Sequence, residues 1–282
     1  MVIADVLHQH NVNSPPLQPF VGKYSDTYLE RQITWNPKCV KKDALFYQFR
    51  TNGDESEDIE IVADGCFNIL FELDSSNPRS MLSGAFNGPR APDLKPNTTY
   101  FGFKPYSSLG FKSPKTNLLL PADTNTDFSC VFPGTESLVA EISEAAGFSD
   151  RIGIFMKYAS ENLIDFEYTP TFIDYMALMI CSSKESIRSG RMAEAIGYSE
   201  RHCRKKFKDR FGIPPKQYSS IIRFQNTLKS LLSGSYEDMS SLALERGYFD
   251  QSHLIRDFKR YTNFSPETYL KKHAEMLKAA SN

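Results

Sequence analysis

Residues 192–218 read MAEAIGYSERHCRKKFKDRFGIPPKQY, and residues 242–269 read LALERGYFDQSHLIRDFKRYTNFSPETY. The second stretch repeats the first. Three residues recur 50 positions later and four recur 51 positions later: Ala193, Gly197 and Tyr198, then Phe207, Lys208, Pro215 and Tyr218. The change of offset indicates one extra residue in the second turn. Each unit predicts a short helix ending near glycine, a tight turn and a second helix of about ten residues, which is the outline of a helix-turn-helix.

The second helix of each unit has an apolar face and a polar face. Apolar residues at helical spacing should point inward: Cys203, Phe207 and Phe211 in the first unit, and Leu254, Phe258 and Tyr261 in the second. The polar face carries side chains that hydrogen-bond to base edges and phosphates. The predicted base contacts are Arg201, Arg204, Lys205, Gln251, Ser252, Ile255 and Arg256, and the predicted phosphate contacts are Lys206, Lys208, Arg210, Lys259 and Arg260.

Two features of these helices have an alternative interpretation. A single basic face is more often merely solvated, but two copies in register argue against that alternative. Glu200, at the edge of the first recognition helix, either selects a base such as cytosine or supplies a favourable charge at the helix N-terminus. We favour the helix charge.

The charge of the chain is divided unevenly. The whole chain has 33 Lys and Arg against 34 Asp and Glu, a net charge of −1. Residues 185–282 hold 18 basic against 11 acidic residues, and residues 200–210 alone hold six against two, so residues 1–184 are acidic. Because Lys and Arg neutralise phosphates, this pattern indicates that only the C-terminal half contacts a polyanion.

The C-terminal half resembles the AraC/XylS class of bacterial transcription regulators over about residues 173–272. The resemblance rests on Met192-Ala193, Gly197-Tyr198-Ser199, Phe207-Lys208, GIPPKQY at 212–218, Arg223-Phe224, Leu231-Leu232, GYFDQSHL at 247–254 and RDFKR at 256–260. It implies seven helices, with two recognition helices joined by one linker helix at about residues 215–233 and entering successive major-groove segments. It also implies activation of transcription and contact with RNA polymerase.

Three residues depart from the pattern of that class: Thr227, Asn263 and Leu270. Thr227 stands where a small alanine usually packs, Asn263 replaces a glycine, and Leu270 replaces a common arginine. Asn263 weakens the resemblance least, because asparagine tolerates a left-handed backbone.

The N-terminal half is predicted to be rich in strands. LFYQF at 45–49 and CFNILFEL at 66–73 are short aromatic and β-branched runs bounded by turn residues, and eleven of the sixteen prolines lie between Pro15 and Pro121. Residues 64–71, 84–89 and 102–105 resemble the sensor half of some members of the same class, which implies a small cupin-like barrel. The predicted fold class is α+β: a β-barrel with two following helices, then an all-α double helix-turn-helix.

Residues 135–148 and 150–163 show helical periodicity after the predicted strands. Their apolar faces either cover the barrel or pair with a second subunit, and the spacing leaves both open. We predict a homodimer formed through these helices. Residues 162–170 lack a clear period and end in proline, so the predicted domains are 1–165, for sensing and dimerisation, and 166–282, for DNA binding.

The aromatic residues of the N-terminal half either line an apolar cavity or fill a core, and a core is the more common arrangement. Arg90 and Lys104 lie close to the aromatic runs in sequence, so they are the candidate cations for an anionic ligand. The candidate ligand-binding residues are Phe49, Phe71, Arg90, Phe103 and Lys104.

The sequence shows no catalytic motif. Only His8 and His10 precede His202, so a metal-binding cupin would need carboxylates or Cys66 to complete its site. GxSxG, P-loop and GxGxxG motifs are absent. We predict a protein that is not an enzyme and has no cofactor or metal. We expect buried free thiols, because no CxxC pair occurs among Cys39, Cys66, Cys130, Cys181 and Cys203.

No apolar run approaches the roughly 18 residues of a membrane span, and the N-terminus does not have the pattern of a secretory signal, so we expect a cytoplasmic protein. The main hypothesis is a sequence-specific DNA-binding transcription regulator, an activator, whose N-terminal domain senses a signal such as a small-molecule effector. Two alternatives stay open. One is a protein-interaction module whose helical half binds an acidic partner, and the other is an enzyme with a hidden site in residues 1–134.

Overall fold

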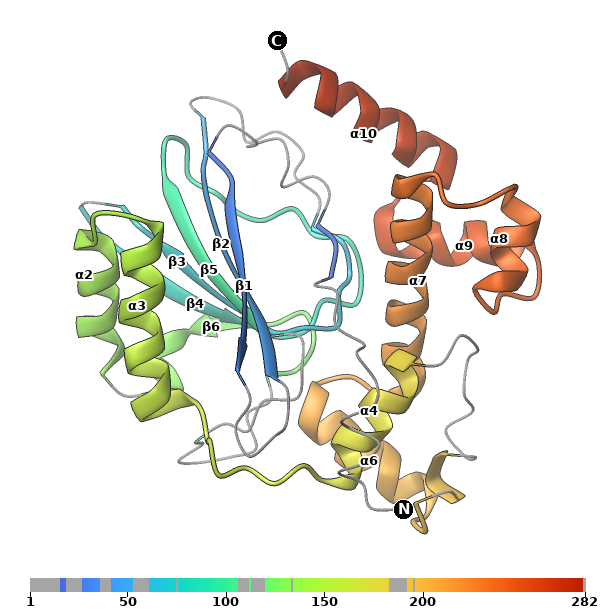
Figure 1. Cartoon of the computed structure of the whole chain (residues 1–282), viewed down its shortest axis with the longest axis horizontal. Coiled ribbons are helices and arrows are strands. Elements are labelled where there is room, and N and C mark those ends of the chain that lie inside the picture. Colours follow the sequence, from blue (N-terminus) through green and yellow to red (C-terminus); the bar gives the residue numbers. More distant parts are fainter. Residues whose placement is uncertain are drawn as a thin grey trace.

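The computed structural model describes residues 16–18, 27–35, 42–52, 61–74, 76–105, 112, 120–132, 134–182, 192–194 and 196–280. The N-terminal half contains an antiparallel sheet, and the C-terminal half is helical (Figure 1). The predicted α+β class is therefore confirmed. None of the helices described is both long enough and apolar enough to cross a membrane. His8 and His10 lie outside the described residues.

The sheet has six strands in the order β1-β2-β5-β3-β4-β6, and every neighbouring pair is antiparallel. Its edges β1 and β6 do not pair with each other, so the sheet is open within the described part of the chain, and a barrel was too specific a prediction. The strands are β1 (Leu29–Trp35), β2 (Lys42–Arg50), β3 (Asn68–Glu72), β4 (Arg79–Ser83), β5 (Thr99–Pro105) and β6 (Asn125–Asp127).

Alternation of side chains gives the sheet two different faces. One face is covered by α2 (Thr135–Glu144) and α3 (Phe148–Tyr158), with η3 (Phe128–Cys130) and η4 (Ala159–Leu163) beside them (Figure 1). Phe155 of α3 packs edge-on against Phe46 and Phe71, with ring centroids 5.6 and 5.9 Å apart. The core under these helices is therefore mainly aromatic.

The two predicted helices after the strands do cover the sheet. Leu138 and Ile142 of α2 and Ile152 of α3 are buried in the same core as the sheet residues. The apolar faces of α2 and α3 therefore cover the sheet, which is one of the two roles that their helical periodicity allowed. A homodimer formed through these two helices, as predicted, would use their outer faces, and it stays a prediction.

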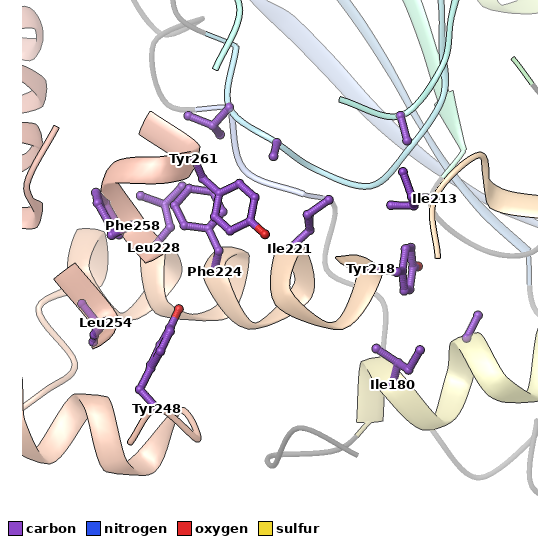
Figure 2. Close-up of a cluster of buried hydrophobic side chains, with 14 of the residues drawn as sticks. Ile180, Ile213, Tyr218, Ile221, Phe224, Leu228, Tyr248, Leu254, Phe258 and Tyr261 are labelled. Atoms are coloured by element: carbon purple, nitrogen blue, oxygen red, sulfur yellow. The ribbon is translucent and has the colours of Figure 1, made fainter. Parts of the chain in front are cut away.

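Several helices of the C-terminal half contact α7 (Pro215–Ser233), which lies at the predicted linker position. Pro215 begins α7 at a position where no backbone N–H is needed, and Gly234, with φ of 65°, ends it. Ile221, Phe224 and Leu228 project from α7 into the cluster of buried side chains shown in Figure 2. The other helices are α4 (Phe172–Ser182), α6 (Glu200–Phe211), α8 (Met239–Glu245), α9 (Gln251–Thr262) and α10 (Pro266–Ala280), and residues 192–194 are also helical.

Loops of the sheet half add residues to the hydrophobic core of the helical half. Val62, Ala63 and Ala85 come from loops of the sheet half and belong to the same buried cluster as the apolar side chains of α7. The side-chain amide of Gln225 in α7 donates to the Ala63 carbonyl at 2.7 Å, and its oxygen accepts from the Leu17 amide at 2.8 Å. The linker helix is thus held to the sheet half by packing and by buried hydrogen bonds.

The predicted domain boundary falls in a segment without helix. Residues 164–171 connect η4 to α4 and contain no helical residue. The division into residues 1–165 and 166–282 stays a prediction.

Candidate nucleic-acid interface and the cavity beside it

The turns of the two repeats have the same backbone geometry. Gly197 and Gly247 have φ of 72° and 73°, in the left-handed region that favours glycine. The Tyr198 amide donates to the Ala193 carbonyl at 3.1 Å, and the Tyr248 amide donates to the Ala243 carbonyl at 2.9 Å. The first helix of each unit therefore ends in the same way, 50 residues apart.

The extra residue of the second turn is Phe249. The Ser199 hydroxyl caps α6 by accepting from the His202 amide, and the Asp250 carboxylate caps α9 by accepting from the His253 amide. These caps are 51 residues apart, whereas the preceding tyrosines, Tyr198 and Tyr248, are 50 apart. The side chain of Phe249 is 86% exposed, so the inserted residue enlarges the turn without entering the core.

The recognition helices also end alike. Gly212 after α6 and Asn263 after α9 are both left-handed, with φ of 73° and 61°. Asn263 thus ends α9 in the same left-handed conformation in which Gly212 ends α6, as the tolerance of asparagine for a left-handed backbone predicts. The departure at Asn263 therefore leaves the helix end unchanged.

The predicted inward faces are confirmed, with one exception. Cys203 and Phe207 in α6 are fully buried, as are Leu254, Phe258 and Tyr261 in α9. Phe211 is only half-buried, at the end of α6. Each recognition helix is therefore fastened to α7 and its neighbours by its apolar face.

Ten of the twelve predicted DNA-contacting side chains are exposed. The exposed residues are Arg201, Arg204, Lys205, Lys206 and Lys208 in α6, and Gln251, Ser252, Arg256, Lys259 and Arg260 in α9. Ile255 and Arg210 are half-buried. The guanidinium of Arg210 lies 5.2 Å from the centre of the Tyr168 ring and 4.0 Å from the Asp174 carboxylate, so it already has partners within the fold. The contacts of all twelve residues with DNA stay predictions.

The linker α7 determines how far apart the two units lie. It has 19 residues, which at the rise of an α-helix gives a length of about 28 Å. The contacts of α7 include both α6 and α9. The length of this linker is comparable to the turn of B-DNA, about 34 Å, that separates successive major-groove segments on one side of the duplex.

Arg223 of α7 holds the second unit, a role that its place in the sequence motif did not indicate. Its guanidinium donates to the Asp257 carboxylate of α9 at 3.0 Å and to the Gly247 carbonyl at 3.4 Å. It also lies 4.3 Å from the centre of the Tyr248 ring. One side chain of the linker thus contacts both the turn and the recognition helix of the second unit.

The sheet face opposite α2 and α3 borders a cavity of about 870 Å³. Leu232 of α7 and His273 of α10 also line it, so the cavity lies between the sheet and the helical half. Phe49, Arg90 and Lys104, three of the five predicted ligand-binding residues, line this cavity. Phe71 and Phe103 do not, because they are fully buried on the opposite face of the sheet, under α2 and α3.

Lys104 lies in the wall of the cavity and forms an ion pair with the buried carboxylate of Asp64. Burial opposes the charge of Lys104, but the neighbouring Asp64, Tyr47 and Cys66 outweigh burial and raise the pKa of the ammonium above its ordinary value. Asp64 also accepts from the Cys66 amide at 2.9 Å and from the Gln18 side chain at 3.0 Å. The charge of Lys104 is thus already neutralised by Asp64 within the protein.

The described cysteines are free thiols, and only one of these four is buried as predicted. Cys130 is exposed, whereas Cys203 is buried and Cys66 and Cys181 are intermediate. Burial raises the pKa of all three non-exposed thiols, to about 11 for Cys181, so they stay protonated at neutral pH. Cys39 lies outside the described residues. No cluster of His, Cys, Asp and Glu suited to a metal ion occurs among the residues described.

Gly102 of β5 lets the ring of Tyr47 lie across the cavity wall. A Cβ atom on Gly102 would lie 2.1 Å from Tyr47 Cζ, so a larger residue at this position would clash with the ring.

Gly102→Ala should therefore lower the free energy of unfolding by about 1–3 kcal/mol, because the ring of Tyr47 would have to move. Urea denaturation measures this loss. Gly153→Ala in α3, where nothing lies within 4 Å of the added atom, is the control and should not destabilise the protein. Equal stability of the two variants would contradict this close packing.

Residues 192–272 match the sequence model of a helix-turn-helix domain. The predicted likeness to AraC-type regulators is thus confirmed for the C-terminal part. An uncharacterized HTH-type transcriptional regulator from Staphylococcus aureus strain MSSA476 is 23% identical over 112 residues, which are 40% of this chain and 14% of that protein. The chain therefore spans only a small part of the length of this curated relative.

Two solved structures have weak similarity to the chain. A transcriptional regulator with an AraC-type DNA-binding domain from Chromobacterium violaceum is 21% identical, with a TM-score of 0.32, and the match covers 35% of this chain and 87% of that one. ToxT from Vibrio cholerae is 12% identical, with a TM-score of 0.40, and the match covers 86% of this chain and 98% of that one.

Proposed function

We propose that this chain is a sequence-specific DNA-binding transcription regulator whose sheet half senses a signal. The observation that carries the proposal is the duplicated recognition helix. In α6 and again in α9, an apolar face is buried and a face with exposed basic side chains points outward, behind a left-handed glycine. The match of residues 192–272 to a helix-turn-helix domain supports the same function.

The proposed mechanism is positional. The two recognition helices, held by α7, would enter successive major-groove segments and together recognise a bipartite site. The phosphate contacts would set the position of the protein along the duplex, and the base contacts would select the DNA sequence. The phosphate contacts that are exposed are Lys206, Lys208, Lys259 and Arg260. Arg210 would have to leave Tyr168 and Asp174 to join them.

The sensing role assigned to the sheet half is supported by the position of the cavity. Because Leu232 and His273 belong to helices of the DNA-binding half, a molecule in the cavity would touch both halves at once. Binding could then change the orientation of α7 relative to the sheet, provided that the molecule has different affinities for the two arrangements. We further propose that the protein acts in the cytoplasm as an activator that contacts RNA polymerase, and that it forms a homodimer.

Arg204→Ala tests whether α6 recognises bases. On a duplex selected from a random library by the full chain, the variant should lose about 1–3 kcal/mol of binding free energy, because a bidentate base contact is lost. On a scrambled duplex the loss should be much smaller. Fluorescence anisotropy at one fixed salt concentration measures both.

Arg50→Ala provides the control for this prediction. Arg50 is an exposed base on β2, far along the chain from the recognition helices, and its loss should change neither affinity. Equal losses for Arg204→Ala on both duplexes would make Arg204 a phosphate contact. If the unaltered chain showed only weak, salt-sensitive binding without any preferred site, the regulator would be rejected in favour of a module that binds an acidic protein.

A further inference from the structure

The cavity wall carries a group of aromatic rings near the β1 edge of the sheet. The strand register places Glu30 opposite Tyr47 and Phe49 opposite Tyr100, so these side chains share the face that borders the cavity. The rings of Tyr47 and Phe49 are nearly parallel, with centroids 6.4 Å apart, and those of Phe49 and Tyr100 are 5.3 Å apart. We call Tyr28, Glu30, Tyr47, Phe49 and Tyr100 the aromatic subsite.

The aromatic subsite includes a carboxylate. Tyr28 packs against the ring cluster, and its hydroxyl donates to Glu30 Oε2 at 2.9 Å. Glu30 is exposed, and no Lys or Arg pairs with it among the described residues. Tyr28 and Tyr47 are each only half-buried, so their rings are accessible from the cavity side. Electron-rich ring faces beside a carboxylate are the arrangement that attracts an organic cation.

The basic residues near these rings are already neutralised. Arg79 donates twice to Glu72 Oε2, at 3.0 and 2.8 Å, and Lys95 lies 2.6 Å from the other oxygen of Glu72. Lys104 is paired with Asp64. A carboxylate ligand at this edge would have to share these cations with Glu72 or Asp64, which already use their charge.

Arg90 lies at the other edge of the sheet. Its guanidinium donates to Asn125 of β6 at 3.2 Å and to the Asp123 carbonyl at 3.0 Å, and it lies 5.2 Å from the centre of the Phe86 ring. β6 and β1 are the two opposite edge strands. Arg90 is therefore separated from Glu30 by the width of the sheet.

The helical half adds no strong cation to the cavity. Of its two lining residues, Leu232 is apolar and His273 is half-buried. Burial lowers the pKa of His273 below its ordinary value, so its imidazole is neutral at pH 7 and above. The electrostatics of the aromatic subsite therefore depend on Glu30 and on the faces of the rings.

We propose that the aromatic subsite binds an organic ammonium ion that carries an aromatic or alkyl tail. The ammonium group lies over the rings and donates to Glu30, and the tail occupies the apolar wall formed by Leu70 and Leu94. This assignment of a ligand class rests on the proposed function, in which the sheet half senses a small molecule.

The test compares three compounds of similar size that differ in charge: 4-phenylbutylamine, 4-phenylbutanol and 4-phenylbutyrate. Isothermal titration calorimetry on the full chain gives the three affinities. The measurement is made at about pH 7.5, where the amine is protonated. The amine should bind at least about fivefold more tightly than the alcohol, in line with cation–π and ion-pair energies, and the butyrate should bind most weakly. Equal or tighter binding of the butyrate, or no binding of the amine, would overturn the proposal.

Two variants locate the binding site. Glu30→Gln should weaken the affinity for the amine by about threefold to tenfold and leave the affinity for the alcohol unchanged, because the carboxylate is exposed and its loss removes only the charge. Glu141→Gln, exposed on α2 and outside the cavity lining, should leave the affinity for the amine unchanged. If Glu30→Gln left the affinity for the amine unchanged, the amine would bind elsewhere and the proposed subsite would be wrong.

The proposed function and the ligand class can fail independently. DNA binding is measured on the same preparation without amine, and amine binding is measured without DNA. A chain that binds its selected duplex but not the amine refutes the ligand class alone. A chain that binds the amine but no preferred duplex refutes the regulator and leaves the subsite in place.

Discussion

Lys104→Met should lower the free energy of unfolding by about 3–5 kcal/mol, because the substitution leaves the buried carboxylate of Asp64 without its cation. Asp64 is 2% exposed, and the remaining donors are an amide of the backbone and the amide of Gln18. These two donors satisfy hydrogen bonds but do not neutralise the charge. Urea denaturation followed by circular dichroism measures the loss.

The double variant Lys104→Met with Asp64→Asn distinguishes an uncompensated charge from lost packing. Removing the charge of Asp64 should recover most of the stability that the single substitution removes, since a neutral amide can keep part of the hydrogen bonding. Lys157→Met, an exposed position, should change the stability by less than about 0.5 kcal/mol. A double variant no more stable than Lys104→Met alone would show that packing, rather than charge, carries the effect.

Arg223→Met should lower the free energy of unfolding by about 3 kcal/mol, because Asp257 and the Gly247 carbonyl both lose their donor. The larger consequence concerns DNA. With the second unit loosened from α7, the half of the bipartite site recognised by α9 should lose protection in a hydroxyl-radical footprint, while the half recognised by α6 keeps it.

Arg223→Lys is the matched control for this prediction. Lysine keeps the positive charge but cannot contact Asp257, the Gly247 carbonyl and the Tyr248 ring with one planar group. It should therefore be intermediate in stability. Uniform loss of protection across both half-sites in Arg223→Met would mean that Arg223 supports the whole domain rather than the second unit.

The double helix-turn-helix was predictable because its signals are local. Helical spacing separates Phe207 and Phe258 from the basic face, and the two repeat offsets locate the extra residue in the second turn. Caps and left-handed glycines act within a few residues, so the printed sequence contains all that determines them.

The sheet half could be predicted only in outline, because its features depend on which distant strands pair. Both faces of β2 carry aromatic residues. Phe46 points toward the helices, and Tyr47 and Phe49 point toward the cavity, so an aromatic side chain alone does not distinguish the core from the cavity wall. The pairing of Lys104 with Asp64 joins residues 40 positions apart. The strand register puts Phe71 and Phe103 on the same side of the sheet as Phe46, and alternation within each single strand does not show that register.

The apolar contact between α7 and the loops of the sheet half affects whether the helical half can be prepared on its own. A fragment that begins at α4 would lose Val62, Ala63 and Ala85 from its buried cluster and would leave Ile221 and Tyr218 facing water on that side. Exposed apolar side chains of this kind promote self-association. Excising the helical half for gel-shift work should therefore produce a poorly soluble polypeptide, and the intact chain is the better reagent.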